Sequence, residues 1–200
     1  MDHATAGSFL GISGVVWFWI LTIIGVGGVV LSLGRRFQLL GTGRPDNLFD
    51  RLDERFRHMM VYALGQKRMF DDPFAGLYHL FIFYGFLVVS LRTVTMVLEG
   101  LFAGWELPLL HTPVGHAYLF SKDVFELLVL VGLVFAVWRR GIQRKERVIQ
   151  SFGAWLVIGL IAILMLTDLG SEGARIAAGD IEGSYLPISS LVAAAFAGLG

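Results

Sequence analysis

The stretch FLGISGVVWFWILTIIGVGGVVLSL, from Phe9 to Leu33, decides the fold class of this chain. It contains no charged residue, and it is longer than the roughly 20 residues that an α-helix needs to cross the hydrocarbon core of a bilayer. Hydrophobic residues make up 56% of the chain and charged residues only 16%, which lies outside the usual balance of a soluble domain. We therefore expect an integral membrane protein.

Further apolar stretches follow the first one and are separated by polar segments. They run from 74 to 98, from 117 to 138, from 152 to 168 and from 188 to 200. The last of them covers only about 20 Å at the rise of an α-helix, so we expect it to be the incomplete start of a helix. The sequence thus predicts an all-α, polytopic bundle of about five transmembrane helices, within a single membrane domain over residues 1–200.

The polar segment after the first predicted helix has an amphipathic pattern. Leu48, Leu52, Phe56 and Met59 recur at near-helical spacing among charged residues. This pattern predicts an interfacial helix over residues 47–66, which lies on the cytoplasmic membrane surface and contacts lipid.

Basic residues are unevenly distributed along the chain. Of the 16 Lys and Arg residues, all but three fall between residues 35 and 68 or between residues 139 and 147. The loops at 99–116 and 169–187 contain one basic residue, Arg175. The positive-inside rule therefore predicts a multi-pass protein of the cytoplasmic (inner) membrane with its N-terminus outside and a last helix that runs inward. Acidic residues dilute the first basic segment, so we expect no nucleic-acid partner.

The chain contains no cysteine. This excludes disulfides, iron–sulfur ligation and thiol catalysis by its own residues. The sequence also shows no glycine-rich phosphate loop and no nucleophile triad, so we do not expect hydrolysis or group transfer.

His79 is the first candidate for chemistry, because ionisable side chains inside a bilayer are unfavourable and commonly functional. It lies about five residues into the second predicted helix, where a neutral imidazole can ligate haem iron. The same helical face carries Gly76, Ile82, Phe83 and Phe86. A glycine leaves room for a flat macrocycle, and the aromatic rings could flank it. The alternative is a histidine that is hydrogen-bonded to a neighbouring helix.

Four further ionisable residues lie at one depth in the second and third predicted helices: Arg92, Lys122, Asp123 and Glu126. The spacing of Lys122 and Glu126 predicts an ion pair within one helix, which leaves Asp123 as the partner of Arg92. The four residues could neutralise one another structurally. They could also line a quinone pocket or a proton path near the outer face.

Three segments resemble parts of a known family. They are GQKRMFDDPFAGLYHLFIFYGF (65–86), FSKDVFELLVLVGLVFAVWRR (120–140) and TDLGSEGARIA (167–177). Together they resemble the membrane domain related to the gamma subunit of nitrate reductase. They are more similar to the version of this domain that is fused to the N-terminus of heterodisulfide-reductase-like iron–sulfur oxidoreductases, including those that serve electron-transfer flavoproteins.

This resemblance implies quinone or menaquinone chemistry coupled to haem b. It also implies electron exchange with a cytoplasmic iron–sulfur protein or domain and, through it, with an electron-transfer flavoprotein. His79 matches the haem-ligand histidine of the family's second helix. The family's further histidines lie on its last helix, so we expect the second axial ligand and the iron–sulfur clusters to lie outside residues 1–200.

We therefore expect the haem- and quinone-interacting membrane part of a quinone-linked oxidoreductase. One alternative is a haem-free membrane anchor, which would show no Soret absorbance. Another is a small transporter or channel, which the outer charged residues would favour. The sequence lacks the broken helix pairs and pseudo-symmetric halves that are common in transporters.

Overall fold

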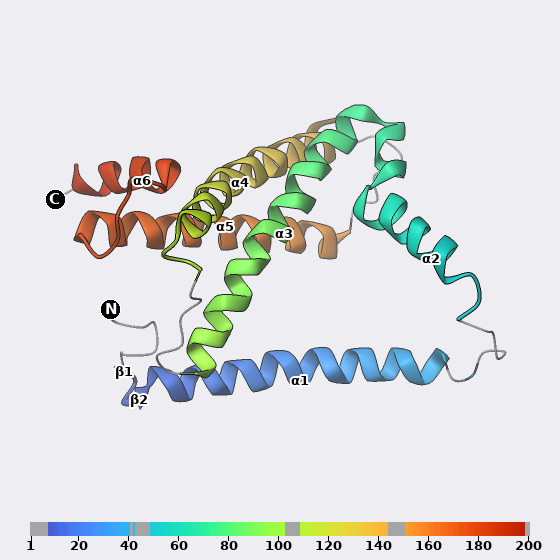
Figure 1. The fold of residues 1–200 in the computed structure, drawn as a ribbon, viewed down its shortest axis with the longest axis horizontal. Coiled ribbons are helices and arrows are strands. Elements are labelled where there is room, and N and C mark those ends of the chain that lie inside the picture. Colours follow the sequence, from blue (N-terminus) through green and yellow to red (C-terminus); the bar gives the residue numbers. More distant parts are fainter. Residues whose placement is uncertain (1–7, 41, 43–48, 103–108, 144–150, 199–200) are drawn as a thin grey trace. The chain divides into compact units, whose positions relative to one another are not determined.

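The computed structural model describes residues 8–40, 42, 49–102, 109–143 and 151–198. Its elements are, in order, β1 (Ser8–Phe9), β2 (Ile12–Ser13), α1 (Gly14–Leu40), α2 (Leu52–His58), η1 (Met59–Leu64), η2 (Lys67–Asp71), α3 (Pro73–Leu101), α4 (Pro113–Trp138), η3 (Arg139–Gln143), α5 (Phe152–Ala178) and α6 (Pro187–Ala197) (Figure 1). Apart from one short hairpin, the elements are helices. The prediction of an all-α membrane protein is confirmed.

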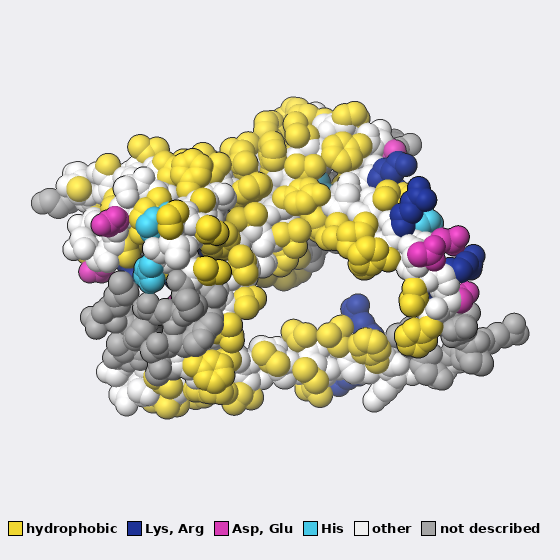
Figure 2. Space-filling view, viewed as in Figure 1, with side chains coloured by type: hydrophobic (Ala, Val, Ile, Leu, Met, Phe, Trp, Pro, Cys, Tyr) yellow, Lys and Arg dark blue, Asp and Glu magenta, His cyan; other side chains and the backbone are white. Residues whose placement is uncertain are grey.

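In the described part of the chain, three helices are long and apolar enough to cross a membrane. These are α1, α3 and α5, whose candidate spans have mean hydropathies of 2.3, 1.9 and 2.2. Helix α4 has a similar length of 26 residues, but it carries three charged side chains. Helix α6 has only 11 residues. The surface of α3 and α4 seen in Figure 2 is largely apolar, which suits contact with lipid.

Contacts within the chain divide it into two compact units, residues 1–60 with 94–106 and residues 61–93 with 107–200. In the first unit, the apolar span of α1 has none of its residues buried. A Cβ atom at Gly100 would lie 2.5 Å from the ring of Phe18, so α1 and the end of α3 pack closely. The single membrane domain over residues 1–200 stays a prediction.

The interfacial segment is helical over residues 52–64. Helix α2 and the π-helix η1 follow each other without a break within the predicted range of 47–66, of which residues 47 and 48 lie outside the described part. The exposed side chains of Arg55 and Asp50 form an ion pair of 2.7 Å there. Charged side chains gather over α2 in Figure 2, as expected for a helix with a polar face.

Helix α1 begins later than the apolar run that predicted it. Leu10 and Gly11 have φ angles of 55° and 74° and form the turn of the hairpin between β1 and β2. The helix therefore starts at Gly14 instead of residue 9 and continues to Leu40.

The second unit has a core between α3, α4 and α5. Its buried residues are Val89, Val129, Leu133 and Met165. Two glycines let α3 and α4 approach closely, since a Cβ atom at Gly85 would lie 2.2 Å from a methyl group of Val129, and one at Gly132 would lie 2.9 Å from the backbone oxygen of Tyr78. The second contact pairs the beginning of α3 with the end of α4.

Helix α5 continues ten residues beyond the predicted end at residue 168. It ends at Ala178, where Gly179 adopts a left-handed conformation with φ 81° and closes the helix. The charged residues Asp168 and Glu172 follow the apolar run, so hydropathy alone ends the helix too early. Both side chains are instead partnered beside α4, so the helix need not end there.

Helix α6 lies beside α5. A Cβ atom at Gly173 of α5 would lie 2.7 Å from a methyl group of Val192, so a glycine allows this contact. Both helices run in the same direction, toward the end marked C in Figure 1. The sequence predicted that this segment starts a helix running inward, opposite in direction to α5. The structure differs from this prediction, because α6 runs parallel to α5.

Candidate functional site

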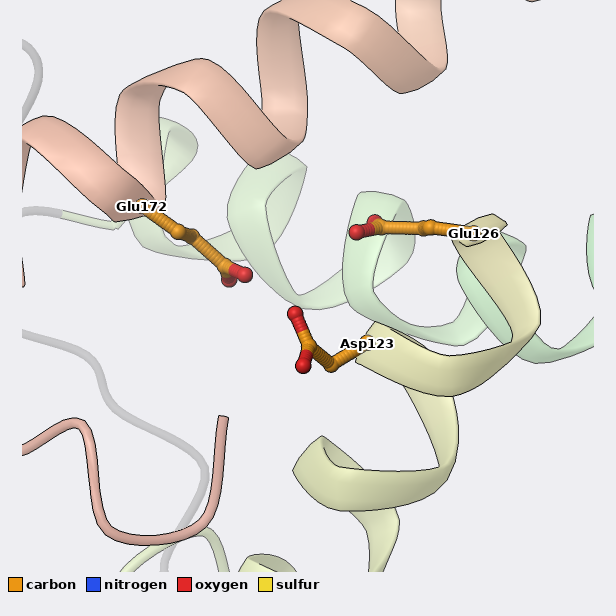
Figure 3. Close-up of side chains that lie close together, drawn as sticks. All are labelled: Asp123, Glu126 and Glu172. Carbon is orange, nitrogen blue, oxygen red and sulfur yellow. The ribbon is translucent and has the colours of Figure 1, made fainter. Parts of the chain in front are cut away.

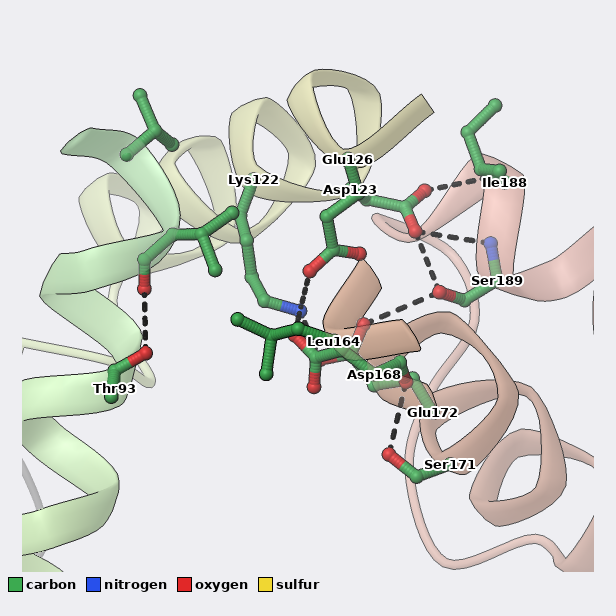
Figure 4. Close-up of polar contacts among 12 residues, drawn as sticks. Thr93, Lys122, Asp123, Glu126, Leu164, Asp168, Ser171, Glu172, Ile188 and Ser189 are labelled. Carbon is green, nitrogen blue, oxygen red and sulfur yellow. Dashed lines mark hydrogen bonds and ion pairs between the residues drawn. The ribbon is translucent and has the colours of Figure 1, made fainter. Parts of the chain in front are cut away.

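A buried ammonium group lies at the centre of the candidate site. The side chain of Lys122 is fully buried, and its Nζ atom is 2.8 Å from Glu126 Oε1, 2.9 Å from Asp168 Oδ2 and 2.9 Å from Glu172 Oε1 (Figure 4). Helix α4 contributes Lys122 and Glu126, and α5 contributes the other two. In each helix the two residues are four positions apart and lie on one face. We call these four residues the charged network. The predicted Lys122–Glu126 pair is confirmed.

Asp123 follows Lys122 in sequence but forms hydrogen bonds with a different helix, α6. Its Oδ2 atom accepts a hydrogen bond from the backbone N–H of Ile188 at 2.6 Å. Its Oδ1 atom accepts one from the backbone N–H of Ser189 at 3.0 Å and one from the Ser189 hydroxyl at 2.6 Å. Asp123 thus caps the N-terminus of α6, where unpaired N–H groups favour an anion. We predicted Arg92 as its partner, whereas both of its oxygens bond α6.

Glu126 is the least stabilised carboxyl group of the site. It is 0% exposed, and apart from the Lys122 ammonium group, 2.8 Å from its Oε1 atom, its oxygens have no hydrogen-bond donor among the described residues. Figure 3 shows that its carboxyl group and those of Asp123 and Glu172 point toward one another. One oxygen atom from each of these three carboxyl groups lies within 4.8 Å of the other two. Negative charge is therefore concentrated in a small, water-poor volume.

Helix α3 approaches the charged network through polar contacts. The Tyr118 hydroxyl of α4 donates a hydrogen bond of 2.9 Å to the backbone oxygen of Val88 on α3. Arg92 follows one turn later on α3, is half-buried, and interacts electrostatically with Asp168. Arg92 thus lies near the charged network, although Asp123 bonds to α6.

His79 lies on α3, apart from the charged network. Its ring stacks on that of Phe83, with ring centres 6.3 Å apart and an interplanar angle of 18°. The predicted opening at Gly76 is filled, because a Cβ atom there would lie 2.7 Å from the backbone oxygen of Met69. The helix η2 packs back against α3 at this point. Gly76 therefore serves close backbone packing, and the idea that it admits a macrocycle is wrong.

A second histidine ligand is not found near His79 on α4. His79 lies at the level of Gly132, because the neighbouring Tyr78 contacts that glycine. His116 lies sixteen positions before Gly132 in α4, which is about 24 Å along the helix. Its ring stacks on Tyr185 instead, at 4.4 Å and 6°. His79 could thus supply one axial ligand of a haem, and α4 could not supply the other.

Three residues of the site were not singled out from the sequence: Asp168, Glu172 and Ser189. Asp168 and Glu172 have the same i, i+4 spacing as Lys122 and Glu126, and both lie in TDLGSEGARIA. A second pair of ionisable residues at this spacing, on another apolar helix, was the available signal for their role. Ser189 carried no such signal, since its partners are 66 and 17 residues away in sequence.

Curated relatives of the chain are oxidoreductases. Over 190 residues, or 94% of the chain, it is 30% identical to the probable iron-sulfur-binding oxidoreductase FadF of Bacillus subtilis (strain 168). Over 131 residues, or 64% of the chain, it is 31% identical to the EtfAB:quinone oxidoreductase of Syntrophomonas wolfei subsp. wolfei. The matched regions make up 27% and 18% of these proteins, so the chain spans about a quarter and a fifth of their lengths.

No family model and no solved structure matches the chain. The comparisons thus support the expected relationship to iron–sulfur oxidoreductases associated with electron-transfer flavoproteins. The resemblance to the gamma subunit of nitrate reductase stays a prediction.

Proposed function

We propose that this chain is the membrane part of a quinone-linked oxidoreductase. It would pass electrons between a cytoplasmic iron–sulfur protein or domain and the quinone pool, with an electron-transfer flavoprotein as a further partner. The names of the two relatives, an iron-sulfur-binding oxidoreductase and an EtfAB:quinone oxidoreductase, support this assignment. The three apolar helices support its location in a membrane.

The charged network is the observation that carries the proposal. Reduction of one quinone to a quinol takes up two electrons and two protons, and oxidation releases them. Inside a bilayer, such chemistry needs side chains that can exchange protons. Glu126, Asp168 and Glu172 supply three carboxyl groups around one ammonium group within otherwise apolar helices. Together with Arg92 and Asp123, they form the quinone and proton site of our proposal.

The two alternatives explain this arrangement less well. A passive anchor has no use for a buried group of charges, whose desolvation is unfavourable. A transporter commonly contains discontinuous helices at its binding site. The candidate spans of α1, α3 and α5 are continuous over 26, 29 and 27 residues. A quinone-linked function therefore remains the better account.

We further propose that His79 holds a haem b. The half-buried imidazole and the stacked Phe83 ring fit one side of such a group. The other axial ligand would come from outside the part of the chain that the structure describes. When bound, a haem would carry single electrons between the iron–sulfur partner and the quinone. His79 would bind the iron, and Phe83 would hold the imidazole in orientation.

The orientation in the membrane also belongs to this proposal. We place the N-terminus outside and the basic segments in the cytoplasm of the cell, which puts His79 toward the inner face and the charged network toward the outer face. Thiol labelling of cysteine variants at the exposed Ser184 and Ser151 from each side can check this orientation.

The haem assignment predicts that His79→Ala removes a haem b signal from the purified complex that contains this chain. Insertion in the membrane should persist, because α3 loses only a side chain. The measurement is a spectrum of the reduced minus the oxidised complex in detergent. His116→Ala is the matched control, since its ring stacks on Tyr185 at the other end of α4. Full haem content in His79→Ala would remove His79 from the haem site.

The quinone assignment predicts that Glu126→Gln lowers turnover of a menaquinone analogue about 100-fold, the typical effect of losing a proton-exchanging group. Haem content should stay unchanged, because His79 is distant from the charged network. Glu182→Gln, which alters an exposed carboxyl group, is the control and should turn over like the wild type. Equal turnover in Glu126→Gln and wild type would place the quinone site elsewhere.

A further inference from the structure

The charges of the site do not balance if every group is ionised. Asp123, Glu126, Asp168 and Glu172 would carry four negative charges. The positive charges near them are those of Lys122, which contacts the last three groups, and of Arg92, which interacts electrostatically with Asp168. Like charges that share a poorly hydrated volume cannot all remain ionised, and the favoured outcome is that a carboxyl group takes up a proton. The question is which group holds it.

Two of the carboxyl groups are well stabilised as anions. Asp123 accepts three hydrogen bonds from the first turn of α6, two of them from backbone N–H groups. Glu172 accepts a hydrogen bond from Lys122 at 2.9 Å, and its side chain is 13% exposed. The Ser189 hydroxyl also lies 3.2 Å from the Oε2 atom of Glu172. Neither Asp123 nor Glu172 needs a proton.

Glu126 and Asp168 differ from these two. The side chain of Glu126 is completely buried. Its one cationic contact is the Lys122 ammonium group at 2.8 Å, which it shares with Asp168 and Glu172, and it has no other hydrogen-bond donor among the described residues. Its carboxyl group and that of Asp168, which is 20% exposed, contact the same ammonium group of Lys122 at 2.8 and 2.9 Å, so the two carboxyl groups are neighbours. Two ionised carboxylates side by side would repel each other, because both can only accept hydrogen bonds. If one of them is protonated, it can donate a hydrogen bond to the other. With one proton the pair keeps one negative charge. Lys122 contacts the pair and Glu172, Arg92 interacts electrostatically with Asp168, and the backbone N–H groups of α6 stabilise Asp123.

We propose that Glu126 and Asp168 hold one exchangeable proton between them, beside the fixed ammonium group of Lys122. The partly exposed Asp168 gives this proton a route to and from the buried Glu126. That the proton passes to or from quinone rests on the proposed function. Charged and polar groups face the pair from each packed helix, namely Arg92 on α3, Tyr118 and Asp123 on α4, Glu172 on α5 and Ser189 on α6.

Infrared spectroscopy of the purified full chain at neutral pH tests the proposal. The wild type should show the C=O stretching band of a protonated carboxyl group, shifted downward in D₂O. This band should disappear in Glu126→Gln and persist in Glu182→Gln. Asp168→Asn, which removes the partner but leaves Glu126, should shift the band. A wild type without the band, or a band that is unchanged in Glu126→Gln, would overturn the proposal.

Stability gives an independent readout. A glutamine has the shape and charge of a protonated glutamate, so Glu126→Gln should keep the thermal midpoint within about 2 °C of the wild type. If Glu126 is instead ionised and paired with Lys122, the same change should lower the midpoint clearly, and that result contradicts the proposal.

The proton site and the quinone function can fail separately. Loss of the band in Glu126→Gln with normal quinone turnover supports the proton site and contradicts the quinone function at this position. Slow turnover in Glu126→Gln without a band in the wild type overturns the proton site and leaves the quinone site in place.

Discussion

Lys122→Met is expected to lower the free energy of unfolding by about 3–5 kcal/mol, the range for breaking a buried ion pair from one side. Lys122 contacts the carboxyl groups of Glu126, Asp168 and Glu172 at 2.8, 2.9 and 2.9 Å. Methionine has a similar length but no charge, so the three carboxyl groups would lose their common partner. Thermal unfolding in detergent, followed by circular dichroism, measures the effect.

The control for this experiment is Lys67→Met, which removes the same charge from an exposed position. A double variant, Lys122→Met with Glu172→Gln, should recover part of the loss because it removes one negative charge together with the positive one. If Lys122→Met unfolds at the same temperature as Lys67→Met, the charged network does not stabilise the packing of α4 on α5.

Gly173→Leu is expected to destabilise the packing of α6 on α5 by about 1–3 kcal/mol, the usual effect of overpacking. A Cβ atom at Gly173 would lie 2.7 Å and 2.9 Å from side-chain atoms of Val192 and 3.2 Å from the backbone nitrogen of Ala193. A leucine would push α6 away from α5 and strain the hydrogen bonds of its first turn to Asp123. The thermal midpoint reports the change.

Gly170→Leu is the matched control for Gly173→Leu. Gly170 lies three residues earlier in the same helix, and a Cβ atom there would have no neighbour within 4 Å. Its replacement should leave the midpoint unchanged or raise it slightly, because leucine favours the helix more than glycine does. Equal loss of stability in both variants would show that α6 is not held against α5 as described.

Hydropathy alone predicted the main helices of this fold, because whether a segment can cross a membrane depends on its own length and composition. The helices α1, α3 and α5 could be located from the length and composition of each segment. The end of α5 could not be located in this way, since Asp168 and Glu172 look like residues of a loop until Lys122 of another helix is brought to them. The direction of α6 likewise depends on its bond to Asp123, which lies 65 residues earlier.

The candidate site, like the fold, was predictable only where the interacting residues lie close together in the sequence. Lys122 and Glu126 belong to one helix, so their spacing revealed the pair before the fold was known. The partner of Asp123 could not be deduced, because any helix of the bundle could have offered donors to it. Gly76 was misread for a similar reason, since the backbone of Met69 fills its open side only after η2 packs against α3.

Ser189 connects the interior charges to the backbone of α6 by a single rotatable bond. Its hydroxyl group lies 2.6 Å from Asp123 Oδ1 and 3.2 Å from Glu172 Oε2, yet it has one hydrogen to donate. The hydroxyl can therefore bond only one of the two acceptors at a time, and the shorter distance favours Asp123. When it turns toward Glu172, Asp123 keeps only its two backbone donors, and the grip on the first turn of α6 weakens. The Ser189 hydroxyl thus links the first turn of α6 to carboxyl groups of both α4 and α5.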